Sequence, residues 1–83
     1  MNKILIKLFV PAANLFFDIL APADLVIEEL IKVLANGVNY MSDGAYAPSG
    51  GETLSQREPE VLFDPSFTLA DYGVHNGAEL IMI

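Results

Sequence analysis

The side chains that could do chemistry are few in this chain, and they are scattered. His75 is the single histidine and stands beside the turn dipeptide Asn76-Gly77. A metal site needs several converging nitrogen, oxygen or sulfur ligands, and none stands at ligand spacing from His75. Cysteine is absent, which excludes thiol chemistry, disulfides and cysteine-based metal sites. We therefore predict no catalytic or metal-binding role for His75.

The serines and carboxylates form no catalytic pattern either. No serine lies in a Gly-x-Ser-x-Gly motif, and Gly50-Gly51 lacks the Lys-Ser/Thr that follows a phosphate-binding loop. The acidic residues are dispersed along the chain, as Glu28, Glu29, Asp43, Glu52, Glu58, Glu60 and Asp64. A solvated acidic surface explains them better than acid–base catalysis. The sequence thus predicts neither an enzyme nor a cofactor site.

Composition limits the partners of the chain. Its 83 residues allow one domain, residues 1–83, with a net charge of −7. The four basic residues, Lys3, Lys7, Lys32 and Arg57, are scattered along the chain. We therefore predict no binding to nucleic acid or to anionic lipid. Hydrophobic residues make up 53% of the chain. This excess indicates either a dense core or an exposed apolar patch for a protein partner.

The amino-terminal stretch resembles a signal peptide only superficially. Lys3 precedes apolar residues, and Ala21-Pro-Ala23 imitates a cleavage site. Lys7 and Asp18 interrupt the apolar run, which also falls short of the roughly 20 apolar residues that a membrane-spanning helix needs. We expect a cytoplasmic protein without membrane insertion.

Two strands are predicted at the start of the chain. Residues 3–9 alternate, with Ile4, Ile6 and Leu8 on one face and Lys3, Leu5, Lys7 and Phe9 on the other, wetter face. Residues 15–20 form the second strand, with Leu15, Phe17 and Ile19 inward and Phe16, Asp18 and Leu20 outward. The short connection through Pro11 and Asn14 predicts an antiparallel hairpin.

A helix follows the hairpin. Asp24 is the expected N-cap, and Asn36-Gly37 is the expected stop. Between them, apolar residues recur at helical spacing as Val26 or Ile27, Leu30, Ile31 and Leu34. Such a stripe predicts a helix that packs on the core.

The middle of the chain carries weaker signals. Residues 37–52 read as a long loop rich in Ser, Asp, Gly and Pro, with room for a helical turn near residues 39–45. Residues 53–57 and 60–63 read as two short strands around Glu58-Pro59.

The last sixteen residues organise the rest. Thr68 and Asp71 have the spacing of a capping box, Gly73 ends that turn, and Asn76-Gly77 makes another. Leu80–Ile83 is apolar throughout, as in a strand with neighbours on both sides. We predict that this strand lies in the middle of a sheet.

Together these elements predict an α+β fold of the β-grasp type. The order is strand, strand, helix, strand, strand, short helical turn, strand. A mixed five-stranded sheet would pack one face on the single helix, with the first and last strands parallel at its centre.

A family resemblance starts from the carboxy-terminal residues. Leu69-Ala-Asp71-Tyr72-Gly73-Val74, followed after four residues by Glu79–Ile83, resembles the end of ubiquitin-like domains. The closing pattern with Gly73, Gly77 and Leu80 is most similar to the YukD/EsaB proteins associated with bacterial type VII (WXG-type) secretion. The resemblance implies that the Tyr72 hydroxyl closes the preceding loop near Asp64.

The resemblance also implies a binding surface. If Leu80 and Met82 pack on the helix, Ile81 and Ile83 face outward. Leu5 and Phe16 share that face, which carries the main apolar recognition patch in ubiquitin. We predict a protein-binding patch of Leu5, Phe16, Ile81 and Ile83, although these side chains could instead cover one another.

The predicted function is non-covalent binding to a protein partner, as an adaptor or regulator linked to type VII secretion. A Gly-Gly tail, typical of conjugated modifiers, is missing after Ile83. Two alternatives are a small accessory subunit of a multicomponent enzyme complex and a modifier that needs processing. Weak homo-oligomerisation is left open.

Overall fold

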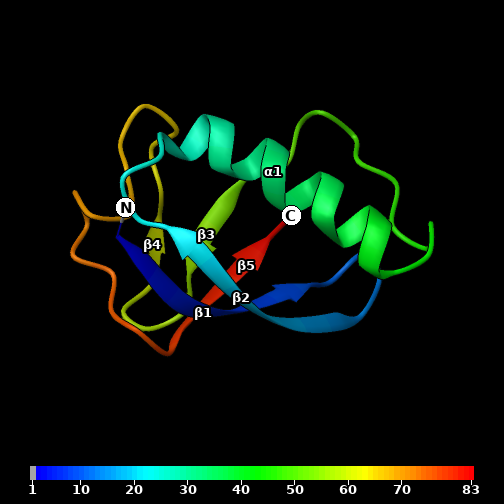
Figure 1. Cartoon of the computed structure of the whole chain (residues 1–83), viewed down its shortest axis with the longest axis horizontal. Coiled ribbons are helices and arrows are strands. Elements are labelled where there is room, and N and C mark those ends of the chain that lie inside the picture. Colours follow the sequence, from blue (N-terminus) through cyan, green and yellow to red (C-terminus); the bar gives the residue numbers. More distant parts are fainter. Residues whose placement is uncertain (1) are drawn as a thin grey trace.

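Five strands and one helix form two layers in the computed structural model, which describes residues 2–83 (Figure 1). The elements in chain order are β1 (Lys3–Val10), β2 (Leu15–Pro22), α1 (Ile27–Met41), β3 (Leu54–Gln56), β4 (Val61–Leu62) and β5 (Ala78–Met82). The sheet order is β2-β1-β5-β3-β4. β1 and β5 run parallel, and every other neighbouring pair is antiparallel. The predicted β-grasp fold is thus confirmed.

β5 lies between two neighbours, as its unbroken apolar sequence predicted. It pairs with β1 from Ile6↔Ala78 to Phe9↔Ile81, and with β3 on its other side. The strand starts two residues before the predicted start at residue 80, and Ile83 lies beyond its end. The backbone of Ile83 still exchanges two hydrogen bonds with Thr53, of 2.5 and 3.0 Å. The end of β5 is therefore held on the β3 side.

The predicted hairpin is confirmed, with strands slightly longer than expected. Ile6 and Leu8 are fully buried beneath α1, as the alternation predicted. The inward side chains of β2, which are Leu15, Phe17 and Ile19, are only half-buried. This difference arises because β2 is an edge strand, with a neighbour on one side.

The helix starts later than predicted, and Asp24 is not its N-cap. α1 begins after Val26, whose side chain makes no capping hydrogen bond. The N–H of Ile27 instead donates to the Phe67 carbonyl (2.7 Å), and the N–H of Glu28 donates to the Pro65 carbonyl (2.9 Å). A segment distant in sequence thus satisfies the first N–H groups, which a local capping rule cannot anticipate.

The helix also continues past Asn36-Gly37, where its end was predicted, and stops at Met41. The reason is Val38, which continues the apolar stripe and is fully buried. Burying a valine side chain offsets the roughly 1 kcal/mol that a mid-helix glycine costs. The turn comes at Asp43 and Gly44, which both adopt positive φ. The predicted helical turn near residues 39–45 is therefore the last turn of α1 and the bend after it.

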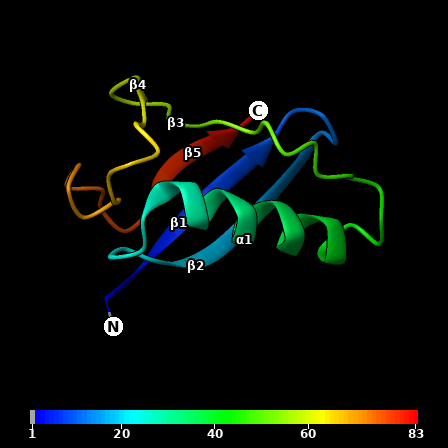
Figure 2. The ribbon, with the colours of Figure 1, turned by 90° about the horizontal axis from the view of Figure 1, so that it is seen from above.

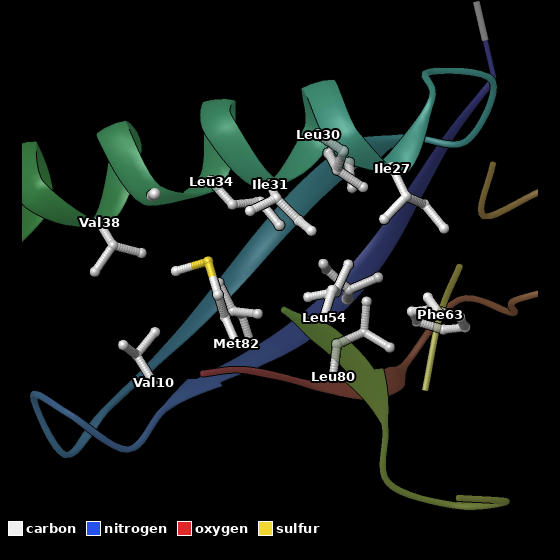
Figure 3. Packing of buried hydrophobic residues seen from close by; sticks show 14 of the residues in the cluster. Val10, Ile27, Leu30, Ile31, Leu34, Val38, Leu54, Phe63, Leu80 and Met82 are labelled. Atoms are coloured by element: carbon white, nitrogen blue, oxygen red, sulfur yellow. The ribbon is translucent and has the colours of Figure 1, made fainter. Parts of the chain in front are cut away.

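The core lies between α1 and the inner face of the sheet (Figure 3). α1 contributes Ile27, Leu30, Ile31, Leu34, Ala35 and Val38, and the sheet contributes Ile6, Leu8, Val10, Leu54, Leu80 and Met82. Tyr46, Phe63 and Leu69 close its margins from the connecting segments. β3 and β4 are shorter than the predicted strands 53–57 and 60–63. Many of the apolar residues fill this core, and other large apolar side chains remain exposed on the surface.

Candidate functional site

The outer face of the sheet, opposite α1, is the candidate site. Viewed from above, α1 lies over one face of the strands (Figure 2). On the other face the strand register places Phe16, Phe9, Ile81, Ser55 and Leu62 in one line across all five strands. We call the four apolar members of this line, Phe9, Phe16, Ile81 and Leu62, the apolar row.

The apolar row is well exposed at both ends. Phe16 is 59% exposed and Leu62 is 70% exposed, whereas Phe9 and Ile81 between them are half-buried. The rings of Phe9 and Phe16 stack, with centroids 4.5 Å apart and planes inclined by 19°. This stacking orders the two aromatic side chains before any partner arrives.

A second line of side chains, with alternating charge, runs beside the apolar row. Asp18 is paired in register with Lys7, and Lys7 with Glu79. Arg57 extends the line, since its backbone N–H donates to the Glu79 carbonyl at 3.0 Å. The outer face therefore presents an apolar band next to a band of alternating charge.

The predicted patch is partly brought together. Phe16 and Ile81 lie in the apolar row, joined by Phe9. Leu5 is on the same face but is paired with Leu20, on the far side of the charged line. Ile83 is exposed beyond the end of β5. The four residues are therefore not one cluster.

Phe9 and Leu62 are two members of the apolar row that the predicted patch lacks. Alternation within one strand puts Phe9 on the outer face together with Lys3 and Lys7, and nothing in the sequence gives the register of the strand that holds Leu62. Only the register across β1, β5, β3 and β4 shows that these side chains continue the same line.

Shallow hollows border the apolar row. One is lined by Lys7, Phe16, Phe17, Asp18 and Glu79. Another is lined by Ser55, Gln56, Arg57, Glu60, Leu62 and Ile81. Both are open and border exposed side chains, unlike the enclosed concave sites that take small molecules. The shape of this face suits contact with another macromolecule.

Two hydrogen bonds join the turn before β5 to Leu5 of β1 and so fix where β5 begins in the sheet. The side chain of Asn76 accepts a hydrogen bond from the Leu5 N–H (2.8 Å), and the Gly77 N–H donates to the Leu5 carbonyl (2.7 Å). His75 lies exposed in the same turn. Within residues 2–83, no three His, Cys, Asp or Glu side chains gather as a metal site would require.

The turn before β5 is closed as predicted. The Asp64 N–H donates to the Tyr72 hydroxyl oxygen at 2.8 Å, which confirms the expected contact. The capping box is also formed, because the Thr68 N–H donates to the Asp71 carboxylate (2.9 Å) and the Asp71 N–H donates to the Thr68 hydroxyl (3.1 Å). These bonds hold the segment that leads into the central strand.

The segment between α1 and β3 is organised by Glu52, a role that the sequence did not reveal. Its carboxylate accepts bonds from the Tyr46 hydroxyl (2.5 Å), the Ser49 N–H (2.7 Å) and the Gly50 N–H (3.1 Å). Burial acts to raise the pKa of Glu52, but these bonds favour the charged form and lower the pKa to about 2. Burial and the bond to Glu52 raise the pKa of Tyr46 to about 12. The end of the predicted loop 37–52 is therefore ordered by the hydrogen bonds to the Glu52 carboxylate.

Comparison with known proteins gives two kinds of match. The sequence pattern of the family described as "WXG100 protein secretion system (Wss), protein YukD" matches residues 5–82. Among solved structures, the ubiquitin-like domain of the Mycobacterium tuberculosis type VII secretion system protein EccD1 has a TM-score of 0.65 at 16% identity, covering 100% of this chain and 99% of that one. No curated protein matches the chain.

Ubiquitin-like domains of eukaryotic proteins are similar as well. A ubiquitin-like domain of an Arabidopsis thaliana protein has a TM-score of 0.71 at 18% identity, covering 100% of this chain and 78% of that one. The ubiquitin-like domain of Plasmodium falciparum Dsk2 has a TM-score of 0.66 at 20% identity, with 99% and 100% covered. At these identities the likeness shows a shared fold. Among the described residues, no helix is long and apolar enough to cross a membrane.

Proposed function

We propose a function from one premise: the chain belongs to the YukD family of proteins of the WXG100 protein secretion system. The proposal is that it acts as a non-covalent adaptor or regulator that binds a protein of a type VII secretion system from the cytoplasmic side. The observation that carries it is the apolar row on the uncovered face of the sheet.

The apolar row has the features of a protein-binding surface. Apolar side chains that gather on one face and are partly exposed to water mark sites where another protein removes them from solvent. The stacked rings of Phe9 and Phe16 supply the aromatic area that is enriched at the centre of interfaces. Because the rings are already ordered, binding costs little side-chain entropy.

The charged line adds specificity to this surface. Asp18, Lys7 and Glu79 alternate in sign beside the apolar row. A partner with the opposite alternation gains favourable contacts, and a partner shifted by one strand meets like charges. The proposed function therefore needs only contact, and it assigns no catalytic step to the chain.

The test is co-purification of secretion-system proteins with the tagged chain from its native host. Phe16→Asp and Ile81→Asp each place a carboxylate in the apolar row, and we expect each to abolish recovery of the partner. Phe67→Asp is the matched control, because Phe67 is 49% exposed and has one aromatic neighbour, Tyr72, away from the apolar row. It should retain the partner.

Thermal unfolding of each variant shows whether the fold is kept. Loss of the partner with Phe16→Asp in a folded chain supports the proposal, since that side chain lies on an edge strand and is more than half exposed. Retention of the partner by both folded row variants, or recovery of no secretion-system protein by the unaltered chain, would contradict it.

A further inference from the structure

β2 forms one edge of the sheet, and no other strand in residues 2–83 pairs with its outer side. It is eight residues long, whereas β4 at the other edge has two. An edge of this length exposes a row of backbone N–H and C=O groups that can pair with another strand. Proteins usually protect such an edge with charges or an internal proline, and β2 has one charged residue, Asp18.

The hydrogen-bond pattern identifies the exposed backbone groups. The Ala23 N–H donates to the Asn2 carbonyl at 2.8 Å. In an antiparallel pair every second residue bonds the neighbouring strand, so the residues of β2 that face β1 are Leu15, Phe17, Ile19 and Ala21. Those whose backbone faces solvent are Phe16, Asp18, Leu20 and Pro22. Pro22 agrees with this assignment, because proline is accepted in a strand where no N–H is needed.

Both faces of this edge are apolar. On the outer face Leu20 is 63% exposed and Phe16 is 59% exposed, one on each side of Asp18. On the inner face Leu15, Phe17 and Ile19 are half-buried. A strand added here would bury apolar surface on both of its sides.

We propose that the β2 edge binds an extended segment of a partner protein as a sixth strand, next to β2. The segment would carry apolar side chains on both faces and basic residues at its ends. Charge complementarity supports this choice, because the edge holds Asp18, Asp24 lies two residues after its end, and the chain has a net charge of −7. Lys7 faces Asp18 from β1 and leaves the other side of Asp18 for the partner.

A second copy of the chain fits this edge less well. Two copies related by a twofold axis pair antiparallel, and a pairing centred on Asp18 sets Asp18 opposite Asp18. Like charges directly opposite one another are unfavourable. Each copy also brings its charge of −7. With a basic segment, both the contact at Asp18 and the interaction with the net charge of the chain are attractive.

The experiment is titration of the ¹⁵N-labelled chain with a synthetic peptide in which Val-Ile-Val-Ile is flanked by lysine pairs. We expect the amides of Phe16, Asp18 and Leu20 to gain protection from hydrogen exchange. The amides of Phe17 and Ile19, already bonded to β1, should change little. A matched peptide with glutamate pairs should bind at least about tenfold more weakly, a difference that salt should reduce.

Leu20→Pro provides the variant that blocks the edge. It removes an outward N–H and leaves the bonds to β1 intact, as Pro22 already does two residues later. Leu20→Thr is its control, because threonine keeps the N–H and favours strands but shortens the apolar side chain. We expect Leu20→Pro to weaken binding of the lysine-flanked peptide about tenfold or more, and Leu20→Thr to weaken it by less.

Three results would overturn the inference. The first is absence of binding, or protection and shift changes centred on the apolar row with β2 unaffected. The second is equal binding of the two peptides, which would remove the basic character of the partner. The third is a dimer in sedimentation experiments that Leu20→Pro dissociates, which would make a second copy the occupant. This inference uses the backbone edge of β2, which shares only Phe16 with the apolar row, and it does not rest on the function proposed above.

Discussion

At the scale of single residues, polar side chains hold the segments that carry no regular structure. Tyr72 and Asp71 fix the turn before β5, and Glu52 fixes the segment before β3. Each of them bonds backbone groups that the sheet and the helix leave without partners. The stability of the segments around the sheet therefore depends on a few hydrogen bonds.

Replacing Tyr72 by Phe tests the first of these bonds. The change removes the hydroxyl that accepts the Asp64 N–H and keeps the ring, whose centroid lies 4.8 Å from that of Phe63. We expect the free energy of unfolding to fall by about 1 kcal/mol, measured by urea denaturation. Tyr40→Phe is the control, because Tyr40 is 87% exposed. Equal stability of the two variants would contradict the role of Tyr72.

Protonation of Glu52 tests the hydrogen bonds that fix the segment before β3. Its pKa is about 2 in the folded chain against an ordinary value of 4.5. A lowered folded pKa means that the contribution of the carboxylate to stability is complete above about pH 4.5 and is lost as the pH falls toward 2. Glu52→Gln should therefore be less stable than the parent near neutral pH, and the difference should shrink below pH 4.5. A difference in melting temperature that stays constant between about pH 4.5 and about pH 2 would contradict this role of Glu52.

At the scale of the elements, the sequence predicts what depends on pattern and misses what depends on distant contacts. Alternation and apolar runs predicted the hairpin, the central β5 and its parallel pairing with β1. Both ends of α1 were misplaced, because Phe67 and Pro65 cap its start and buried Val38 extends its end. The apolar row could not be predicted for a related reason. Its members come from four strands, and the pattern within one strand does not give the register between strands.

Gly37 provides a prediction at this scale. It lies inside α1, where glycine costs about 0.5–1 kcal/mol relative to alanine. A methyl group there would approach no atom closer than the Met41 Cε, at 3.9 Å, which is ordinary contact. We expect Gly37→Ala to raise the free energy of unfolding by about 0.5–1 kcal/mol in urea denaturation.

Gly44→Ala is the matched control for Gly37→Ala. An alanine at residue 44 would also meet open space, but Gly44 has a φ of 85°, where a side chain is strained. It should lower stability. A gain at both positions would mean that the unfolded chain, and not the helix, determines the effect of these glycines.

At the scale of the whole molecule, net charge opposes a compact fold. Eleven acidic and four basic residues give −7 on 83 residues. The alternating line of Asp18, Lys7 and Glu79 and the pair of Glu29 and Lys32 (3.6 Å) are attractive, but such exposed pairs contribute little each. The repulsion among the remaining carboxylates should therefore outweigh them.

Salt separates these two contributions. Raising sodium chloride from about 10 mM to about 0.5 M shortens the screening length from roughly 30 Å to less than 10 Å and weakens long-range repulsion most. We expect the melting temperature to rise at neutral pH, measured by circular dichroism. Replacing three exposed acids, Asp43, Glu58 and Glu60, by their amides should reduce that rise, because they add to the net charge and form no ion pair in the described chain. A melting temperature that falls with salt would show instead that the attractive pairs dominate.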